Sequence, residues 1–153
     1  MPDIFNHDFR DFIDALNKNE VRYLLVGGYA VILHGHARTT GDMDIWVECT
    51  KENYVKLVKA FKVFRMPVFD MTEENFLNTE KHDVFRFGRN PVAIDIMTKM
   101  SNFNFEETYK KVTWFEDEDL RIPVIHINTL IEAKKAAGRQ KDLNDLEWLG
   151  NSE

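Results

Sequence analysis

Apolar positions along the chain follow two periods, and these periods predict its helices and strands. Where apolar residues recur every three or four positions with charged residues between them, as from Phe5 to Leu16, one face of a helix is apolar. Short runs of aromatic, branched and other apolar residues, such as residues 23–26, indicate strands instead. The predicted helices cover residues 5–18, 29–33, 51–64, 72–78 and 129–149, and the predicted strands cover residues 23–26, 43–48, 84–87, 92–97, 112–115 and 121–127.

Turn-forming residues between these segments indicate how the strands connect. Residues 88–91 (Gly-Arg-Asn-Pro) join two strands as a hairpin, and the acidic residues 116–119 join two more as a second hairpin or an edge pair. Gly138 either separates two helices or lies within one. The order of elements predicts an α+β fold, in which helices lie on one side of a mixed sheet and the chain ends in helices.

Length and composition describe one globular domain over residues 1–153. The 44% hydrophobic share and the 12 Phe, 4 Tyr and 3 Trp exclude a disordered chain. A net charge of −6 disfavours non-specific binding to nucleic acid or to an anionic membrane. Cys49 has no second cysteine, the first ten residues do not resemble a secretion signal, and no apolar stretch is long enough to span a bilayer. We therefore expect a soluble, cytoplasmic protein.

Three aspartates are the first candidates for chemistry. Asp42 and Asp44 flank Met43 on a predicted strand, so both carboxylates point to one face of it. Asp95 interrupts an otherwise apolar strand, where an unpaired carboxylate would be costly. Adjacent carboxylates are commonly compensated by a hard divalent cation, of which magnesium is the natural candidate. The simpler interpretation of the Asp42–Asp44 pair alone is a solvated turn.

A glycine turn and a basic segment are candidates for binding phosphates. Gly27 and Gly28 close a strand and open a helix, so their backbone can approach an anion without a Cβ in the way, although a tight turn is the simpler explanation. Arg38 and Thr40 precede the aspartates and could contact a polyphosphate, while Arg38 could equally form a surface ion pair. His34 and His36 lack further zinc ligands nearby and are interpreted as core or turn residues.

Together these motifs resemble the nucleotidyltransferase signature of the DNA polymerase beta superfamily. In that pattern a strand leads to a glycine pair at a helix start, Asp-x-Asp follows on the next strand, and a later apolar strand supplies a third Asp. The tail resembles small bacterial members related to AbiEii toxins and minimal nucleotidyltransferases. The resemblance is carried by residues 23–31, His34, Gly35, Arg38, Thr40, residues 42–45, Asp95 and, in the tail, residues 122–125, Lys134, Arg139, residues 141–142 and residues 145–146.

The resemblance implies both an activity and a set of roles. Asp42, Asp44 and Asp95 would hold two Mg²⁺ ions on a nucleoside triphosphate, and Asp95 could instead act as a base. The Gly27–Gly28 turn would bind the phosphates, although Gly28 stands where many members have a serine hydroxyl. Lys134 or Lys141 would lie near the triphosphate; the alternative is a solvated helix face whose lysines pair locally with Asp142, Asp145 or Glu132.

The first hypothesis is a metal-dependent nucleotidyltransferase that moves a nucleoside monophosphate from a triphosphate to an acceptor hydroxyl. The acceptor is a small molecule, a protein or a tRNA end, and its binding would involve the C-terminal helices, a homodimer interface or a partner protein. The second hypothesis is a non-catalytic module of the same fold, such as a toxin–antitoxin component or a nucleotide-binding regulator. The third is a purely structural domain, which predicts that Asp95 is ion-paired to Arg38 or Arg86 with no open cleft beside it.

Overall fold

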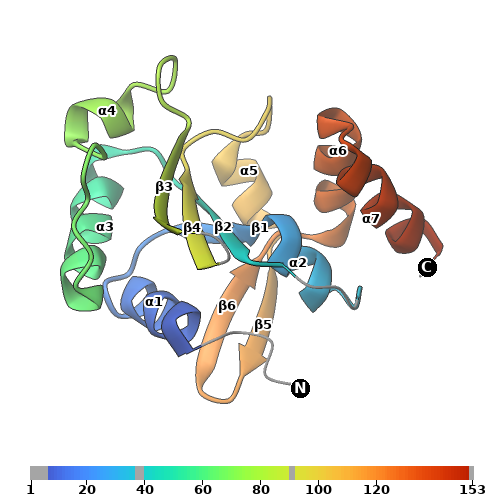
Figure 1. The fold of residues 1–153 in the computed structure, drawn as a ribbon, viewed down its shortest axis with the longest axis horizontal. Helices are drawn as coiled ribbons and strands as arrows, with labels where there is room; N and C mark the ends of the chain where they lie inside the picture. The colour runs from blue at the N-terminus through green and yellow to red at the C-terminus, as the bar shows by residue number, and fades with distance from the viewer. Residues whose placement is uncertain (1–6, 37–39, 90–91, 152–153) are drawn as a thin grey trace.

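A computed structural model describes residues 7–36, 40–89 and 92–151 as seven helices around one six-stranded sheet (Figure 1). The helices are α1 (His7–Lys18), α2 (Gly27–Leu33), α3 (Lys51–Phe64), α4 (Glu73–Leu77), α5 (Phe105–Lys110), α6 (Ile127–Ala137) and α7 (Gln140–Asn151). The strands are β1 (Tyr23–Val26), β2 (Asp42–Val47), β3 (Val84–Arg89), β4 (Val92–Met97), β5 (Thr113–Asp117) and β6 (Leu120–Val124).

The sheet is mixed, and its strand order brings distant parts of the chain together. The order is β3-β4-β2-β1-β6-β5. Strands β2 and β4 run parallel, as do β1 and β6, and the remaining neighbours are antiparallel. Because β2 and β4 are parallel neighbours, the predicted carboxylate strands lie side by side at the centre of the sheet.

One face of the sheet is covered by α1 and α3 through aromatic packing. The Phe12 ring of α1 contacts the Phe61 ring of α3 at 5.6 Å between centroids, and Phe61 contacts Phe87 of β3 at 4.8 Å. The hydroxyl of Tyr23, on β1, donates to Asn17 of α1 at 2.7 Å. Met43 and Ile45 of β2 are fully buried on this side, which is the main core of the molecule.

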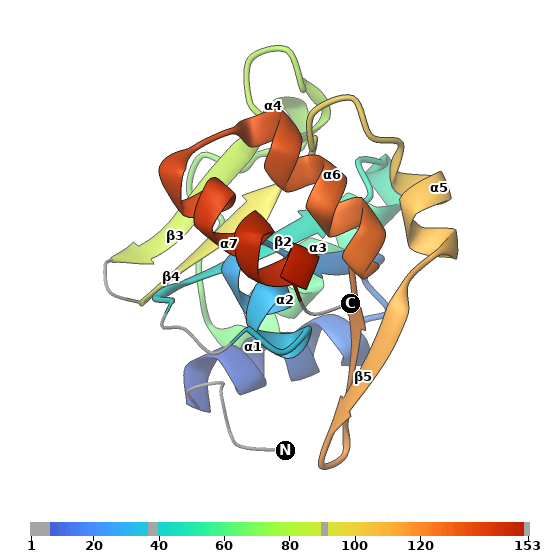
Figure 2. The same cartoon turned by 90° about the vertical axis from the view of Figure 1, so that its right-hand side faces the viewer.

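The opposite face carries helices as well, so the expectation of helices on one side is wrong. Trp46 packs against Phe105 of α5 at 5.2 Å, and α6 and α7 lie on the side of the sheet away from α1 and α3 (Figures 1 and 2). The physical reason is that this face is itself partly apolar, with Leu24 and Trp46 beside the carboxylates, and these side chains must be covered.

Most predicted elements are present, with differences at particular ends. Helix α3 has the predicted bounds because Thr50 caps its first turn, accepting from the backbone of Asn53, and Arg65 ends it in a left-handed conformation. Thr72 caps α4 as predicted. Gly138 separates α6 from α7 with φ 64°, which resolves the alternative left open for this segment.

The structure adds one helix to the predicted elements, and it confirms the second hairpin with a shorter turn. Helix α5 was not predicted; it is short, and its start is marked by Asn104, which accepts from the backbone of Glu107. The acidic turn is shorter than expected, because β5 extends to Asp117, whose buried carboxylate pairs with Arg10 of α1. In the part of the chain that is described, no helix has the length and apolar character needed to cross a membrane.

Candidate active site

Asp44 and Asp95 lie directly opposite each other on neighbouring strands. The register of β2 and β4 pairs Asp44 with Asp95, and Asp42 with Ala93. Side chains alternate along a strand, so Asp42, Asp44 and Asp95 all project from the sheet face that looks toward α6. The strand pairing therefore brings together carboxylates that are far apart in the sequence.

The negative charges of Asp44 and Asp95, the two central carboxylates, are not fully compensated by positive charges around them. Burial, together with the neighbouring charge of Asp95, raises the pKa of Asp44 to about 6. Burial also raises the pKa of Asp95, against the lowering effect of Arg86. The Oδ1 atom of Asp95 is buried and has no hydrogen-bond partner. A buried acceptor without a partner is costly, so this pair is suited to bind a cation or to take up a proton.

Arg86 supplies part of the missing positive charge. It lies on β3 opposite Asp95, and its guanidinium is 3.0 Å from Asp42 Oδ1 and 3.4 Å from Asp95 Oδ2. This ion pair agrees with one expectation of the purely structural hypothesis. The other expectation, that no cleft lies beside Asp95, is not met, because Asp95 lines two adjoining pockets.

Gly27 is a glycine because Asp44 lies against it. Its φ is 68°, and a Cβ built there would be 2.0 Å from Asp44 Oδ2. Any larger residue would both strain the backbone and displace the carboxylate. The turn between β1 and α2 and the carboxylate of β2 are thus one packed unit at the end of β1.

A buried network of charges joins α6 to α7 beside the carboxylates. The ammonium of Lys134 is 3.1 Å from Asp142 and 3.2 Å from Asp145, and all three residues are buried. Arg139 donates to Asp142 at 2.6 Å while most of its own side chain is exposed. Lys134 therefore does not lie on a solvated helix face, although the predicted local pairing with both aspartates is present.

A polar pocket of about 200 Å³ gathers nearly all of the predicted site residues. Arg86 and Arg139, which were not among them, complete its lining. The predicted Arg38 lies outside the described residues. The predicted residues that line the pocket are Gly27, Gly28, Thr40, Asp42, Asp44, Asp95, Lys134 and Lys141.

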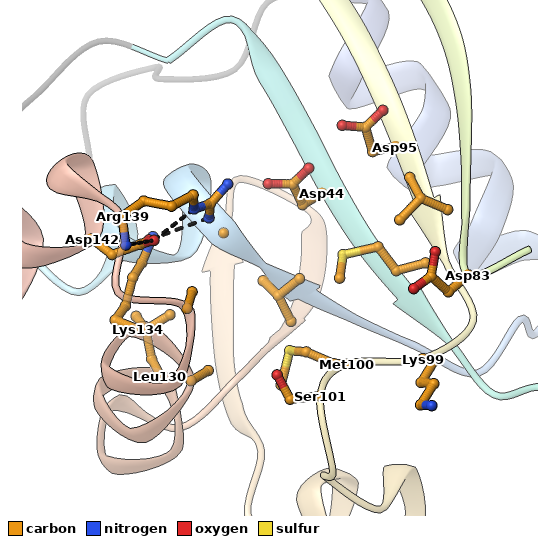
Figure 3. Close-up of a pocket in the computed structure, with 16 residues that line it drawn as sticks. Asp44, Asp83, Asp95, Lys99, Met100, Ser101, Leu130, Lys134, Arg139 and Asp142 are labelled. Atoms are coloured by element: carbon orange, nitrogen blue, oxygen red, sulfur yellow. Dashed lines mark hydrogen bonds and ion pairs between the residues drawn. The ribbon is translucent and has the colours of Figure 1, made fainter. Parts of the chain in front are cut away.

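A second pocket of about 350 Å³ opens from the same carboxylates in another direction (Figure 3). It shares Gly27, Asp44, Asp95, Lys134 and Arg139 with the polar pocket. Its remaining lining is largely aliphatic and thioether: Val26, Val84, Met97, Met100, Leu130, Ala133 and Ala137, with Asp83, Lys99 and Ser101 farther from the carboxylates.

The carboxylates fit a magnesium site that a substrate would complete. Among the described residues, no group of three or more His, Cys, Asp or Glu side chains could hold a metal by itself, and the Asp42 carboxylate is paired with Arg86. Magnesium, however, is usually bound by one or two carboxylates together with substrate phosphates. The unpartnered Asp95 Oδ1 and the Asp44 carboxylate directly opposite it are the pair of oxygen ligands that such an ion needs.

Some residues of the site were missed from the sequence, and Arg86 is one of them. The predicted strand ends, residues 87 and 92, place Val84 opposite Asp95; in the structure β3 continues to Arg89, which pairs with Val92, so Arg86 lies opposite Asp95 instead. The two histidines are turn residues as expected: His34 contacts the carbonyl oxygen of Ile125 at 2.8 Å, and the His36 ring packs on Trp148.

Comparison with known proteins supports the fold and leaves the family undefined. No family model matches the chain, and no curated protein is similar to it in sequence. The lincosamide antibiotic adenylyltransferase LnuA, in a lincomycin-bound crystal structure, matches with a TM-score of 0.62 at 16% identity, covering 96% of this chain and 97% of that one.

A second solved structure is from Thermotoga maritima, a protein provisionally assigned as a nucleotidyltransferase. It matches with a TM-score of 0.56 at 16% identity, covering 95% of this chain and 91% of that one. The chain shares the fold of these two proteins. In this fold the predicted aspartates lie at the centre of the sheet. Neither structure bears on the resemblance to AbiEii toxins, which stays a prediction.

Proposed function

We propose that the protein is a magnesium-dependent nucleotidyltransferase that transfers a nucleoside monophosphate from a nucleoside triphosphate to an acceptor hydroxyl. The observation that carries this proposal is the facing pair Asp44 and Asp95, with an unpartnered carboxylate oxygen, at the junction of a cationic pocket and a second pocket. A purely structural domain has no physical reason to keep this charge arrangement.

The polar pocket has the composition that a triphosphate requires. Four cationic side chains, those of Arg86, Lys134, Arg139 and Lys141, line it together with the three carboxylates, although the overall charge of the chain is −6. The glycine backbone at residues 27–28 allows close approach of phosphate oxygens. Thr40 adds a hydroxyl at the same pocket. A local cationic pocket in an acidic protein favours a compact anion over a long nucleic acid.

Asp44 and Asp95 would hold the metal, and Asp42 would join them if Arg86 turned to a phosphate. Bound magnesium would neutralise charge on the triphosphate and orient it. In the transfer itself, the acceptor oxygen forms a bond to the α-phosphorus, the bond to the pyrophosphate oxygen breaks, and pyrophosphate leaves. The hydroxyl proton passes to Asp95, whose free Oδ1 and raised pKa suit it to accept one.

The similarity to the lincosamide adenylyltransferase supports transfer by a chain of this size. The two chains cover each other almost completely, so this chain spans nearly the whole of that enzyme's chain. The identity of the nucleotide, the acceptor and any homodimer or partner protein are further proposals, for which a small molecule, a protein and a tRNA end are the candidates.

The decisive test is calorimetric titration with ATP, GTP, CTP and UTP, with and without Mg²⁺. We expect at least one triphosphate to bind in the presence of Mg²⁺ and to lose binding in an Asp42→Ala, Asp44→Ala double variant. Asp70→Asn, which removes an exposed carboxylate outside both pockets, is the control.

The outcomes separate the hypotheses. Binding of a triphosphate without any pyrophosphate release in the presence of candidate acceptors would favour the non-catalytic regulator or toxin–antitoxin component. If no triphosphate bound to the folded protein, the assignment of the polar pocket would be wrong.

A further inference from the structure

The second pocket is the part of the site whose occupant the proposed function leaves unassigned. It begins at Asp44 and Asp95 and extends between the sheet and α6 toward the loop that follows β4 (Figure 3). The inference below rests on the proposed function, because it takes the polar pocket to hold the triphosphate.

We propose that this pocket binds the acceptor, and that the acceptor is a small hydroxylated molecule with an apolar body and a cationic amine, which Asp83 recognises. The acceptor's hydroxyl would lie beside Asp44 and Asp95, where the two pockets meet.

The volume and walls of the pocket indicate a small, partly apolar occupant. About 350 Å³ falls within the range of small-molecule sites. Its inner walls are formed by Val26, Met100 and Leu130, which are buried. Apolar walls of this kind gain free energy from an apolar group and none from a phosphate.

The same walls do not favour the nucleoside half of the donor. Bases are commonly bound by stacking on aromatic rings or on a guanidinium plane. None of the described residues that line this pocket has an aromatic side chain, and its one guanidinium among them, that of Arg139, is held by Asp142 through Nε and Nη2. The aliphatic and thioether lining instead matches an aliphatic or saturated-ring body.

Asp83 places a negative charge at the far end of the pocket. Among the described residues, the cations of the rest of the site do not form an ion pair with it. Asp142 pairs with Lys134 and Arg139, and Asp95 pairs with Arg86, whereas no ion pair joins Asp83 to another described residue. Lys99 lines the same end of the pocket, and in Figure 3 its ammonium is directed away from Asp83. Asp83 is therefore available to a cation that lies in the pocket.

The test first identifies the size and charge class of the acceptor. The protein is incubated with Mg²⁺ and the α-³²P-labelled form of the triphosphate that binds it. Three fractions of cells of the source organism serve as acceptors: molecules below about 1 kDa, RNA, and protein. The small-molecule fraction is also divided on a cation exchanger. We expect label to appear in the small molecules that the exchanger retains.

Label found on RNA or protein, or only on small molecules that the exchanger does not retain, would overturn the proposal. Loss of triphosphate binding, or the absence of label in every fraction while the triphosphate still binds, would instead be a failure of the proposed function and would overturn the inference with it, so the two failures are distinguishable.

Two variants then connect the acceptor to this pocket. Ala133→Phe fills the pocket from α6, and Ala136→Phe places the same ring on an exposed part of the same helix as a control. We expect Ala133→Phe to abolish labelling of the small molecule and to leave the Kd of the triphosphate unchanged. If Ala133→Phe remained folded but lost triphosphate binding, the pocket would hold the nucleoside and the proposal would be wrong.

The role of Asp83 is tested on the labelled acceptor purified from that fraction. Asp83→Asn is expected to raise the acceptor KM roughly tenfold, the effect of losing one charge-assisted contact, with little change in kcat or in triphosphate Kd. Asp70→Asn is the matched control. An unchanged KM in Asp83→Asn would remove Asp83, and with it the cationic amine, from the proposal.

Discussion

At the scale of single residues, Asp44 combines burial with a neighbouring like charge, and this makes stability depend on pH. Its pKa is about 6 in the folded protein, against an ordinary value of 3.8. The folded state therefore binds more protons than the unfolded state between these values, and stability falls as pH rises through this range. Above about pH 6 the full penalty is present, and below pH 3.8 it vanishes.

We accordingly expect Asp44→Asn to stabilise the metal-free protein at pH 8 by about 1–3 kcal/mol, with the gain shrinking toward pH 4. Urea unfolding in EDTA at several pH values measures this difference. Asp70→Asn, at an exposed position, should show no such pH-dependent gain. An equal effect of Asp44→Asn at pH 4 and pH 8 would contradict the explanation.

Gly27 shows how a backbone position and a carboxylate depend on each other. Because a Cβ at this position would lie 2.0 Å from Asp44 Oδ2 and φ is 68°, Gly27→Ala combines a clash with backbone strain. We expect it to lower the free energy of unfolding by about 1–3 kcal/mol and to weaken triphosphate binding. Chemical denaturation and calorimetry test this. Gly28→Ala, where φ is not in the left-handed region, should be milder.

At the scale of elements, α6 and α7 are joined by the buried charges of Lys134, Asp142 and Asp145. Replacing Lys134 by Met would remove the ammonium that lies between two buried carboxylates and contacts both of them. We expect Lys134→Met to lower the free energy of unfolding by about 3 kcal/mol. Lys135→Met, on the exposed side of the same helix, should change it little. Equal effects of the two variants would argue against the network.

At the scale of the whole molecule, an acidic chain presents one cationic pocket next to a carboxylate pair. If this pocket binds a magnesium triphosphate, binding must stabilise the folded state. At a free ligand concentration of about 100 times Kd the gain is about 2.7 kcal/mol. We expect thermal unfolding to shift upward with Mg²⁺ and the triphosphate together, and to lose this shift in EDTA or in Asp44→Ala. A shift that persisted in Asp44→Ala would place the ligand elsewhere.

Much of the architecture could be predicted because its signals are local. Three kinds of signal each depend on residues close together in the chain. They are the alternation from Met43 to Val47, the caps at Thr50 and Thr72, and the hairpin before Asp95. The alternation also places Asp42 and Asp44 on one strand face. Helices α4 and α5 are both too short to show periodicity; α4 was predicted from its Thr72 cap, whereas the Asn104 cap of α5 was overlooked.

The sequence by itself therefore determined most of the strands, most of the helices and the three aspartates as candidates for chemistry. The tertiary structure alone decided which sheet face each helix covers, that Lys134 is buried between Asp142 and Asp145, and that Asp83 lines the pocket opening from Asp44 and Asp95. These features depend on contacts between residues distant in the chain. Such contacts follow from strand order and register, which local periodicity does not specify.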